Sequence, residues 1–274
     1  MVELRRTVRF TIPAGEGAGG RNAFAGKPPM RDLGRYYEVD VVCVGEPDPA
    51  TGYLIDIKRI DDAVRESLVP RLAEKIRQNP LVAPESVAGE LFGALRERMG
   101  ELARGVVWRL TPAQSIEIIL EGDMPTSDQT RVLVRERFDF AASHRLHVPG
   151  LSEEENRRLF GKCNHPSGHG HNYRLETCVR LPIGTSGRTP FGVDDLERLV
   201  DELVLSRFDH KHLNLDTEEF REGSGLNPTV ENIARVCYER LAPAVRGAGA
   251  DAELMCVTVW ETDRTSSTYP ARRP

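Results

Sequence analysis

Residues 170–176 read GHNYRLE, and 136 positions earlier residues 34–40 read GRYYEVD. A second pair of words has the same offset, because IKRIDDAV begins at Ile57 and VDDLERLV begins at Val193. Two segments in one register indicate a tandem duplication, although two unrelated domains with similar elements would share part of this pattern. A chain of 274 residues is long enough for two small domains, each with its own core.

The residue patterns around these words predict the same class of elements in both halves. Alternating runs predict strands, and a repeat near 3.6 residues predicts helices. In the first half the expected strands are 2–12, 36–45, 106–112 and 115–121, and the expected helices are 58–76 and 84–104. In the second half the expected strands are 131–143, 171–181 and 252–263, and the expected helices are 192–208 and 228–245. The first half therefore reads ββααββ, and the second half repeats that order with a single closing strand.

The polar stretch GDMPTSDQT, residues 122–130, interrupts both periodicities and contains Gly and Pro. Such composition is typical of a linker between domains. The sequence thus predicts one domain over 1–121 and another over 131–274.

Composition narrows the functional classes. The net charge of −5 and pI of about 5.9 provide no basic field for nucleic acid. No apolar run approaches the roughly 20 residues that cross a bilayer, and the first residues lack the apolar core of a signal peptide. Five scattered cysteines without a CxxC pair argue against a disulfide framework, so we expect a cytoplasmic protein with no membrane or nucleic-acid partner.

All seven histidines lie between His144 and His212. On a strand, His169 and His171 point to the same face, and His144 closes the preceding expected strand. Three neutral imidazoles with an open fourth position are typical of catalytic zinc, whereas a thiolate as fourth ligand would make the site structural. An HxH pair alone is a weak signal, since a Gly-rich loop with histidines can be a solvated turn.

The first half lacks this cluster, because the offset of 136 places Leu33 opposite His169 and Arg35 opposite His171. A histidine cluster kept in only one of two copies favours a role in chemistry over a role in folding.

Further polar residues accompany the histidines. Cys163 follows Lys162, whose charge would favour the thiolate, so the thiol is a candidate base. Asp209 and His210 are an adjacent carboxylate and imidazole able to pass on a proton, and a Cys, His and Asp set also fits acyl transfer. Glu261, near a strand end, is either a surface carboxylate or a buried anchor for a ligand with paired N–H donors.

Five ordered motifs, listed here, closely resemble the 6-pyruvoyl tetrahydropterin synthase family: FDFAASHRL, SEEENRRLFGKCNHPSGHGHNY, FDHKHLN, PTVENIA and VWETD. The resemblance covers about residues 131 to 270. It implies an α+β fold of tandem tunnelling-fold (T-fold) domains, each an antiparallel sheet backed by two helices, which assemble into a barrel. It also implies a first domain that is a degenerate copy without zinc ligands.

The resemblance implies a zinc-dependent lyase that converts 7,8-dihydroneopterin triphosphate to 6-pyruvoyl tetrahydropterin and triphosphate, with magnesium on the triphosphate. The implied roles fall on the matching positions: zinc ligands His144, His169 and His171; catalytic residues Cys163, Asp209 and His210; pterin-binding residues Glu261 and Thr229. Single-domain members form trimers stacked into hexamers with active sites between subunits. A two-domain chain is therefore expected to form a trimeric pseudo-hexamer with one active site per chain.

Two alternatives remain open. The 6-carboxytetrahydropterin synthases resemble the same fold and use the same substrate, but their gap between the cysteine and HGH is usually shorter than the five residues found here. The other alternative is a non-catalytic module that binds zinc and a pterin.

Overall fold

The computed structural model describes residues 1–15, 28, 30, 32–120, 131–182, 191–249 and 251–271. The chain forms two compact units, of which the first comprises Met1–Val134 and Leu181–Thr189 and the second comprises Arg135–Arg180 and Pro190–Pro274. The predicted linker, residues 122–130, lies outside the described residues, and the domain bounds 1–121 and 131–274 stay a prediction. Among the described residues, no helix is both long and apolar enough to cross a membrane.

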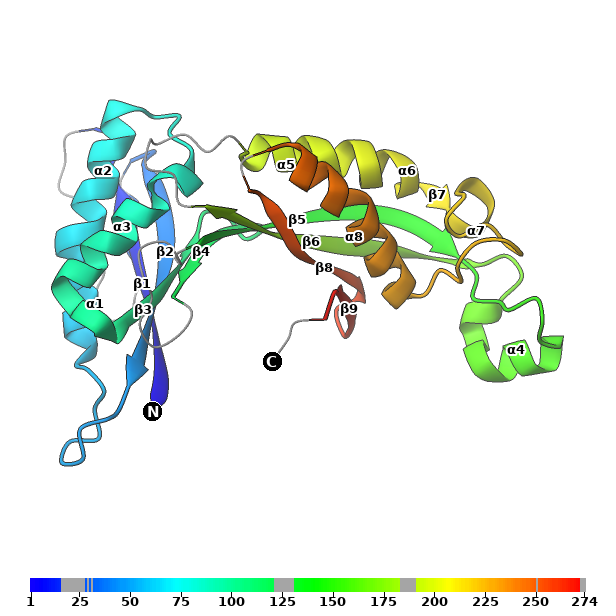
Figure 1. Cartoon of the computed structure of the whole chain (residues 1–274), viewed down its shortest axis with the longest axis horizontal. Helices are drawn as coiled ribbons and strands as arrows, with labels where there is room; N and C mark the ends of the chain where they lie inside the picture. The colour runs from blue at the N-terminus through cyan, green and yellow to red at the C-terminus, as the bar shows by residue number, and fades with distance from the viewer. Residues whose placement is uncertain are drawn as a thin grey trace. The chain divides into compact units, whose positions relative to one another are not determined.

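The first unit is a four-stranded antiparallel sheet with helices packed on it (Figure 1). Its strands are β1 (Val2–Ile12), β2 (Arg35–Gly45), β3 (Ala103–Arg109) and β4 (Gln114–Ile119), in that spatial order. Its helical segments are α1 (Ile57–Ala63), the π-helical η1 (Val64–Leu68), α2 (Val69–Gln78), α3 (Pro84–Met99) and the short η2 (Gly100–Leu102). The sequence predicts the second helix over 84–104, but α3 ends at Met99. Gly100 has a φ of 63°, and Ala103 already begins β3.

The second unit repeats this plan with additions. Its strands are β5 (Arg131–His144), β6 (His169–Pro182), β7 (Lys211–His212), β8 (Glu253–Thr262) and β9 (Thr265–Tyr269). Its helical segments are α4 (Glu153–Phe160), η4 (Gly161–Asn164), α5 (Val193–Val200), the π-helical η5 (Asp201–Leu205), α6 (Ser206–Phe208), α7 (Leu213–Asp216) and α8 (Val230–Gly247). The strand order is β5-β6-β8-β9, in which β6–β8 and β8–β9 are antiparallel pairs, and β7 pairs with β5 in parallel.

Two structural details repeat between the units. A five-residue π-helical segment interrupts the first long helix in each, as η1 and as η5. A buried aromatic pair also recurs, because Tyr37 contacts Phe10 at 5.8 Å between ring centroids and Tyr173 contacts Phe140 at 5.0 Å. Tyr37 and Tyr173 are related by the offset that the sequence words share. The tandem α+β fold predicted from the sequence is therefore confirmed.

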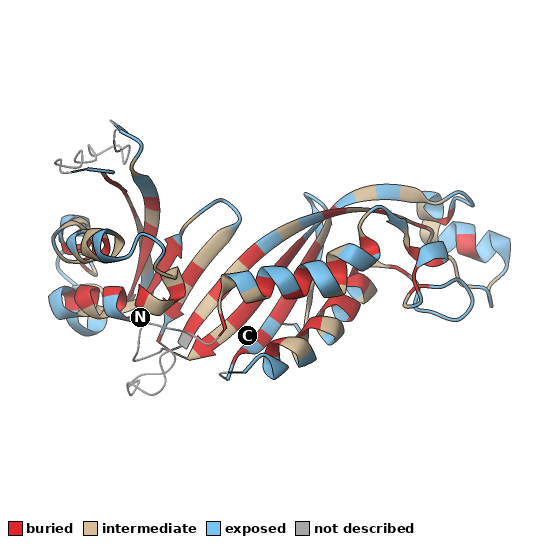
Figure 2. Ribbon diagram, turned by 90° about the horizontal axis from the view of Figure 1, so that it is seen from above, coloured by how far each residue is buried: buried red, intermediate tan, exposed pale blue. Residues whose placement is uncertain are grey.

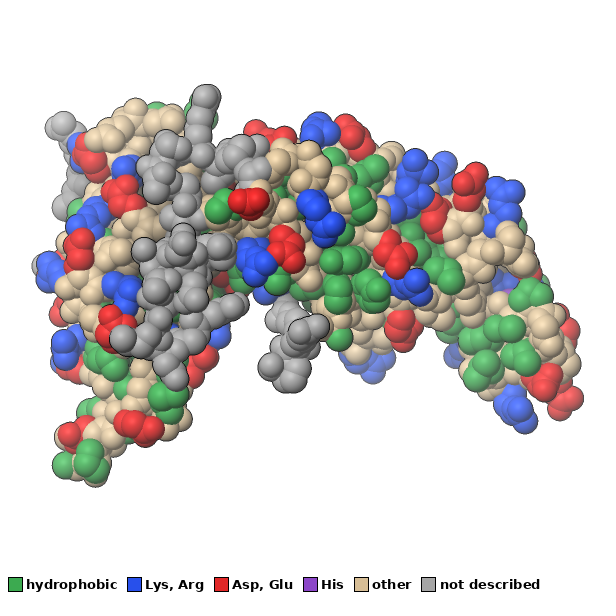
Figure 3. All heavy atoms as spheres, in the orientation of Figure 1, with side chains coloured by type: hydrophobic (Ala, Val, Ile, Leu, Met, Phe, Trp, Pro, Cys, Tyr) green, Lys and Arg blue, Asp and Glu red, His purple; other side chains and the backbone are tan. Residues whose placement is uncertain are grey.

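Buried residues follow the strands and the inner sides of the helices (Figure 2). Two helices of the second unit begin at residues whose side chains cap the helix N-terminus. Ser152 and Glu155 form a reciprocal capping box on α4, and the Thr229 hydroxyl accepts a hydrogen bond from Asn232 N at the start of α8. Acidic and basic side chains are interspersed among the described residues on the face in Figure 3, in line with the modest net charge.

Candidate active site

The first strand positions of β6 carry two of the clustered histidines. His169, His171 and Tyr173 alternate along β6 and their rings contact one another in sequence, at 4.8 and 5.5 Å between centroids. The preceding turn depends on Gly168, whose φ is 67° and whose N–H donates to His165 O at 2.8 Å. A Cβ at this glycine would lie 2.8 Å from His144 O, so the close approach of the turn to β5 requires glycine.

His144, the last residue of β5, is fully buried. Its Nδ1 lies 2.7 Å from the carbonyl oxygen of Pro228, which identifies Nδ1 as the protonated nitrogen and leaves a lone pair on Nε2. Burial lowers the pKa of His144 to about 4, against the opposing effect of the Pro228 hydrogen bond, so the ring is neutral near pH 7. Burial also lowers the pKa of His169. These are neutral imidazoles, the form that binds a metal.

The three imidazoles converge on one point. One ligand nitrogen from each of His144, His169 and His171 lies within 4.8 Å of the other two. His144 Nε2 is 3.1 Å from His169 Nε2, and His171 Nε2 is buried without a hydrogen-bond partner. A buried ring nitrogen without a hydrogen-bond partner costs free energy unless another group, such as a cation, pairs with it. The donor set therefore fits a divalent metal of the zinc type, which takes imidazole nitrogen readily.

Glu261 lies beside this cluster. Its Oε1 is 3.4 Å from His144 Nε2 and 3.5 Å from His171 Nε2. The side chain keeps 20% of its exposure, so the carboxylate is within reach of a ligand entering from solvent.

Cys163 lies in η4 and is half-buried, whereas the other four cysteines are buried. Its carbonyl accepts a hydrogen bond from Leu146 N at 2.8 Å, and the side chain of the neighbouring Asn164 donates to Leu146 O at 2.8 Å. Leu146 is two residues beyond His144, so these bonds fix the cysteine turn relative to the histidine cluster.

The expectation that Lys162 favours the thiolate does not hold in this structure. Burial, and then the negative charge of Glu261, raise the pKa of Cys163 above the ordinary thiol value. The exposed Lys162 side chain does not offset these two effects.

Asp209 and His210 form a pair at the edge of β5. Asp209 Oδ2 is 2.9 Å from His210 Nδ1, and its Oδ1 accepts a hydrogen bond from Ala141 N at 2.8 Å. The hydrogen bond from the Ala141 N–H lowers the pKa of Asp209, and the hydrogen bond with the His210 side chain lowers it further. His210 has a φ of 56°, rare for a residue with a side chain, and its own N–H donates to Ala141 O at 2.6 Å.

The His210 ring is 83% exposed. Among the described residues, no hydrogen bond or ion pair joins Cys163 to Asp209 or His210. The structure thus groups the three histidines with Glu261, but it leaves the predicted proton relay in two separate parts within one chain.

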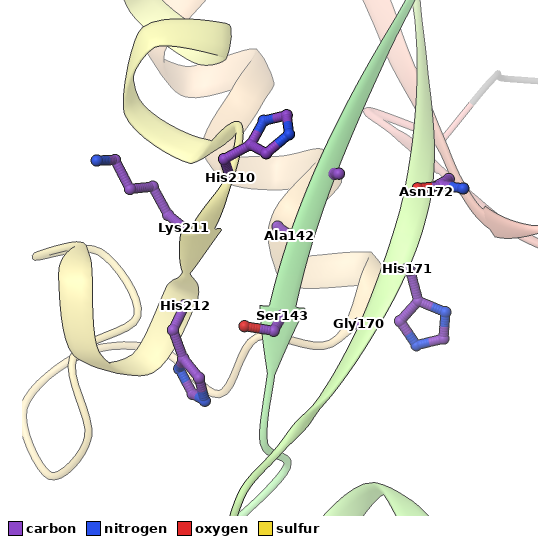
Figure 4. A pocket seen from close by; sticks show the side chains of 9 residues that line it. Ala142, Ser143, Gly170, His171, Asn172, His210, Lys211 and His212 are labelled. Carbon is purple, nitrogen blue, oxygen red and sulfur yellow. The ribbon is translucent and has the colours of Figure 1, made fainter.

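A pocket of about 390 Å³ lies over the ends of β5, β6 and β7 (Figure 4). His171 contributes from one side of β5, and His210 and Lys211 contribute from the other. Thr229 does not line this pocket; it caps α8 directly after Pro228, the residue that fixes the His144 tautomer. The Pro228 carbonyl could not be inferred from the sequence, because nothing in PTVENIA shows that the chain before α8 returns to the end of β5.

The first unit has no equivalent cluster among its described residues. Leu33, which corresponds to His169, is 97% exposed, and Arg35, which corresponds to His171, donates from its guanidinium to Pro80 O at 2.8 Å.

The family model and the curated relatives match about half of this chain, in the region of the second unit. The family model described as 6-pyruvoyl tetrahydropterin synthase matches residues 133–272. The human 6-pyruvoyl tetrahydrobiopterin synthase is 38% identical over 136 residues, which is 50% of this chain and 89% of that protein. A putative 6-pyruvoyl tetrahydrobiopterin synthase of Caenorhabditis elegans is 39% identical over 142 residues, covering 50% of this chain and 94% of that protein.

Two solved structures are similar to this chain in part or in full. The Caenorhabditis elegans 6-pyruvoyl tetrahydropterin synthase structure has 33% identity and a TM-score of 0.46, covering 52% of this chain and 96% of the other. The uricase of Arthrobacter globiformis aligns over 100% of this chain and 96% of its own, with 10% identity and a TM-score of 0.45.

Proposed function

Because this chain belongs to the 6-pyruvoyl tetrahydropterin synthase family, we propose that it is a zinc-dependent lyase. It would convert 7,8-dihydroneopterin triphosphate to 6-pyruvoyl tetrahydropterin and triphosphate. The observation that carries the proposal is the convergence of His144, His169 and His171 inside the matched region. The three imidazoles would hold zinc, which when bound acts as a Lewis acid on the side-chain hydroxyls of the substrate. Magnesium would accompany the triphosphate.

The protein residues have separate tasks in this proposal. The Sγ of Cys163, as thiolate, would remove a proton from the carbon chain of the substrate. Glu261 would accept hydrogen bonds from the paired N–H donors of the pterin ring, assisted by the Thr229 hydroxyl.

The Asp209–His210 pair would return or remove protons at its exposed imidazole edge. Since this edge does not contact Cys163 of the same chain, the relay would be completed between chains of an oligomer, which we propose to be a trimer acting as a pseudo-hexamer.

Identification of the product tests this function. Zinc-loaded protein incubated with 7,8-dihydroneopterin triphosphate should release triphosphate and yield a product with the mass of 6-pyruvoyl tetrahydropterin. A product with the mass of 6-carboxytetrahydropterin would assign the alternative activity.

A variant separates catalysis from binding. Cys163→Ala should retain bound zinc and an unchanged circular dichroism spectrum but lose turnover. Loss of zinc from this variant would mark the thiol as a structural ligand, and no turnover by the zinc-loaded natural chain would contradict the enzymatic proposal.

A further inference from the structure

The position of Glu261 is unexplained by a pterin-binding role alone. Its Oε1 lies 3.4 Å from His144 Nε2 and 3.5 Å from His171 Nε2, while His144 Nε2 lies 3.1 Å from His169 Nε2. One oxygen and three nitrogens thus gather in one small volume.

Three of the six separations among these atoms are close to those between ligands of one tetrahedral metal, and the three histidine nitrogens lie within 4.8 Å of one another. Ligand atoms about 2.0 to 2.2 Å from zinc, at tetrahedral angles, are separated by roughly 3.3 to 3.6 Å. Two of these three separations fall inside this range and the third, 3.1 Å, lies just below it.

A hydrogen bond between Glu261 and His144 does not account for the contact. The His144 proton is on Nδ1, which donates to Pro228 O, so Nε2 presents a lone pair toward the carboxylate. Two lone pairs at this separation repel each other unless a cation lies between them. The carboxylate and the imidazole are therefore arranged toward a shared positive ion.

The backbone explains how a residue near the end of β8 reaches this point. In the β8–β9 pair, Trp260 pairs with Ser266 but Thr262 pairs with Thr265, so the register shifts at Glu261. A bulge of this kind changes the direction of a side chain and is frequent beside active sites. The irregularity turns the Glu261 carboxylate toward the ends of β5 and β6.

We propose that Glu261 is a fourth, displaceable ligand of the zinc ion in the protein without substrate. The inference rests on the proposed zinc site and adds to it, because the same carboxylate is expected to accept the N–H donors of the pterin. An arriving pterin would then draw the carboxylate away and open the fourth position on the metal to the substrate hydroxyls. Until substrate arrives, the site would be closed to water and to competing ligands.

Cobalt(II) substitution tests the ligand set without measuring activity, because its visible absorption depends on the atoms and geometry around the metal. We expect Glu261→Gln to shift the visible bands of the cobalt protein and to lower zinc affinity by about tenfold or more. In the natural chain, neopterin, which is already oxidised and is not turned over, should shift the cobalt bands in the absence of any reaction.

Asp263→Asn is the matched control, since it removes one exposed negative charge two residues further along and should leave bands and affinity unchanged. If Glu261→Gln folds poorly, Glu261→Asp keeps the charge but shortens the side chain, and we expect it to shift the bands too.

Two outcomes separate this inference from the proposed function. Unchanged cobalt bands and zinc affinity in both Glu261 variants would overturn the inference and leave the three-histidine site intact. A natural chain that binds neither zinc nor cobalt, or binds them equally well as His171→Ala, would overturn the proposed function with it.

Discussion

At the scale of single residues, the thiol of Cys163 is the group whose protonation is most informative. Burial and the Glu261 charge both raise its pKa, so in the metal-free protein the thiolate forms only above the pH at which an ordinary thiol ionises. Because only the thiolate is alkylated, the alkylation rate should rise with pH and reach half its maximum above about 8.5. Iodoacetamide labelling of the metal-free protein at a series of pH values, followed by mass spectrometry, measures this.

The same experiment identifies the cause. Glu261→Gln removes one of the two effects, so its half-maximal pH should lie below that of the natural chain. Cys163→Ala should show no rapid labelling, because the other four cysteines are buried. A half-maximal pH below that of a free thiol would show that a positively charged group outweighs the effects of burial and of Glu261 on the pKa of Cys163.

Much of the site is predictable from residue spacing, and the remainder depends on contacts between distant segments. The HGH spacing places His169 and His171 on one strand face because side chains alternate along a strand. The preceding strand then supplies His144. No local pattern shows that Pro228 O fixes the His144 tautomer, or that Glu261 approaches the imidazoles through a bulge. Both depend on chain segments more than 80 residues apart that meet only in the folded unit.

At the scale of elements, the turn into β6 couples local backbone geometry to the metal site. Gly168 has a φ of 67°, and a Cβ there would lie 2.8 Å from both His144 O and His212 Nε2. We expect Gly168→Ala to push the start of β6 away from the end of β5 and to separate His169 from His144. Zinc affinity, measured by competition with a chromophoric chelator, should fall by about tenfold or more, and the free energy of unfolding should fall by roughly 1 to 3 kcal/mol.

Gly223→Ala provides the control for backbone strain. Gly223 has a φ of 86°, but a Cβ there would meet no atom within 4 Å. This variant should lose stability through the unfavourable φ alone and keep its zinc affinity. An equal loss of zinc affinity in both variants would show that strain, and not the close approach of Gly168 to His144, controls the site.

Sequence patterns predict whether a segment is a helix or a strand better than they predict where that segment ends or which short elements are added to it. Sequence periodicity identifies the long helices, but it cannot show the π-helical interruptions at 64–68 and 201–205, since these change the hydrogen bonding without changing which residues are apolar. The strand β9 is missed because TSSTY carries little apolar character and is held mainly by its pairing with β8.

At the scale of the whole molecule, the duplication separates two roles. The second unit carries the histidine cluster, whereas the first retains the sheet, the π-helical interruption and the buried aromatic pair. The features shared by both units belong to the fold, whereas the histidine cluster, found in the second unit, belongs to the proposed chemistry. Leu33, at the position that corresponds to a proposed zinc ligand, is 97% exposed.

This division predicts both a mass and a metal content. Three chains of 30.6 kDa would supply six sheet units, as in the proposed pseudo-hexamer, and light scattering should give about 92 kDa. Because Leu33 and Arg35 offer no ligand for zinc, elemental analysis should find one zinc per chain and not two. His171→Ala should remove the zinc while leaving the mass unchanged, since the His171 ring packs on His169 and Tyr173 of its own unit. A monomeric mass would contradict the trimer, and two zinc ions per chain would show that the first unit holds a site of its own.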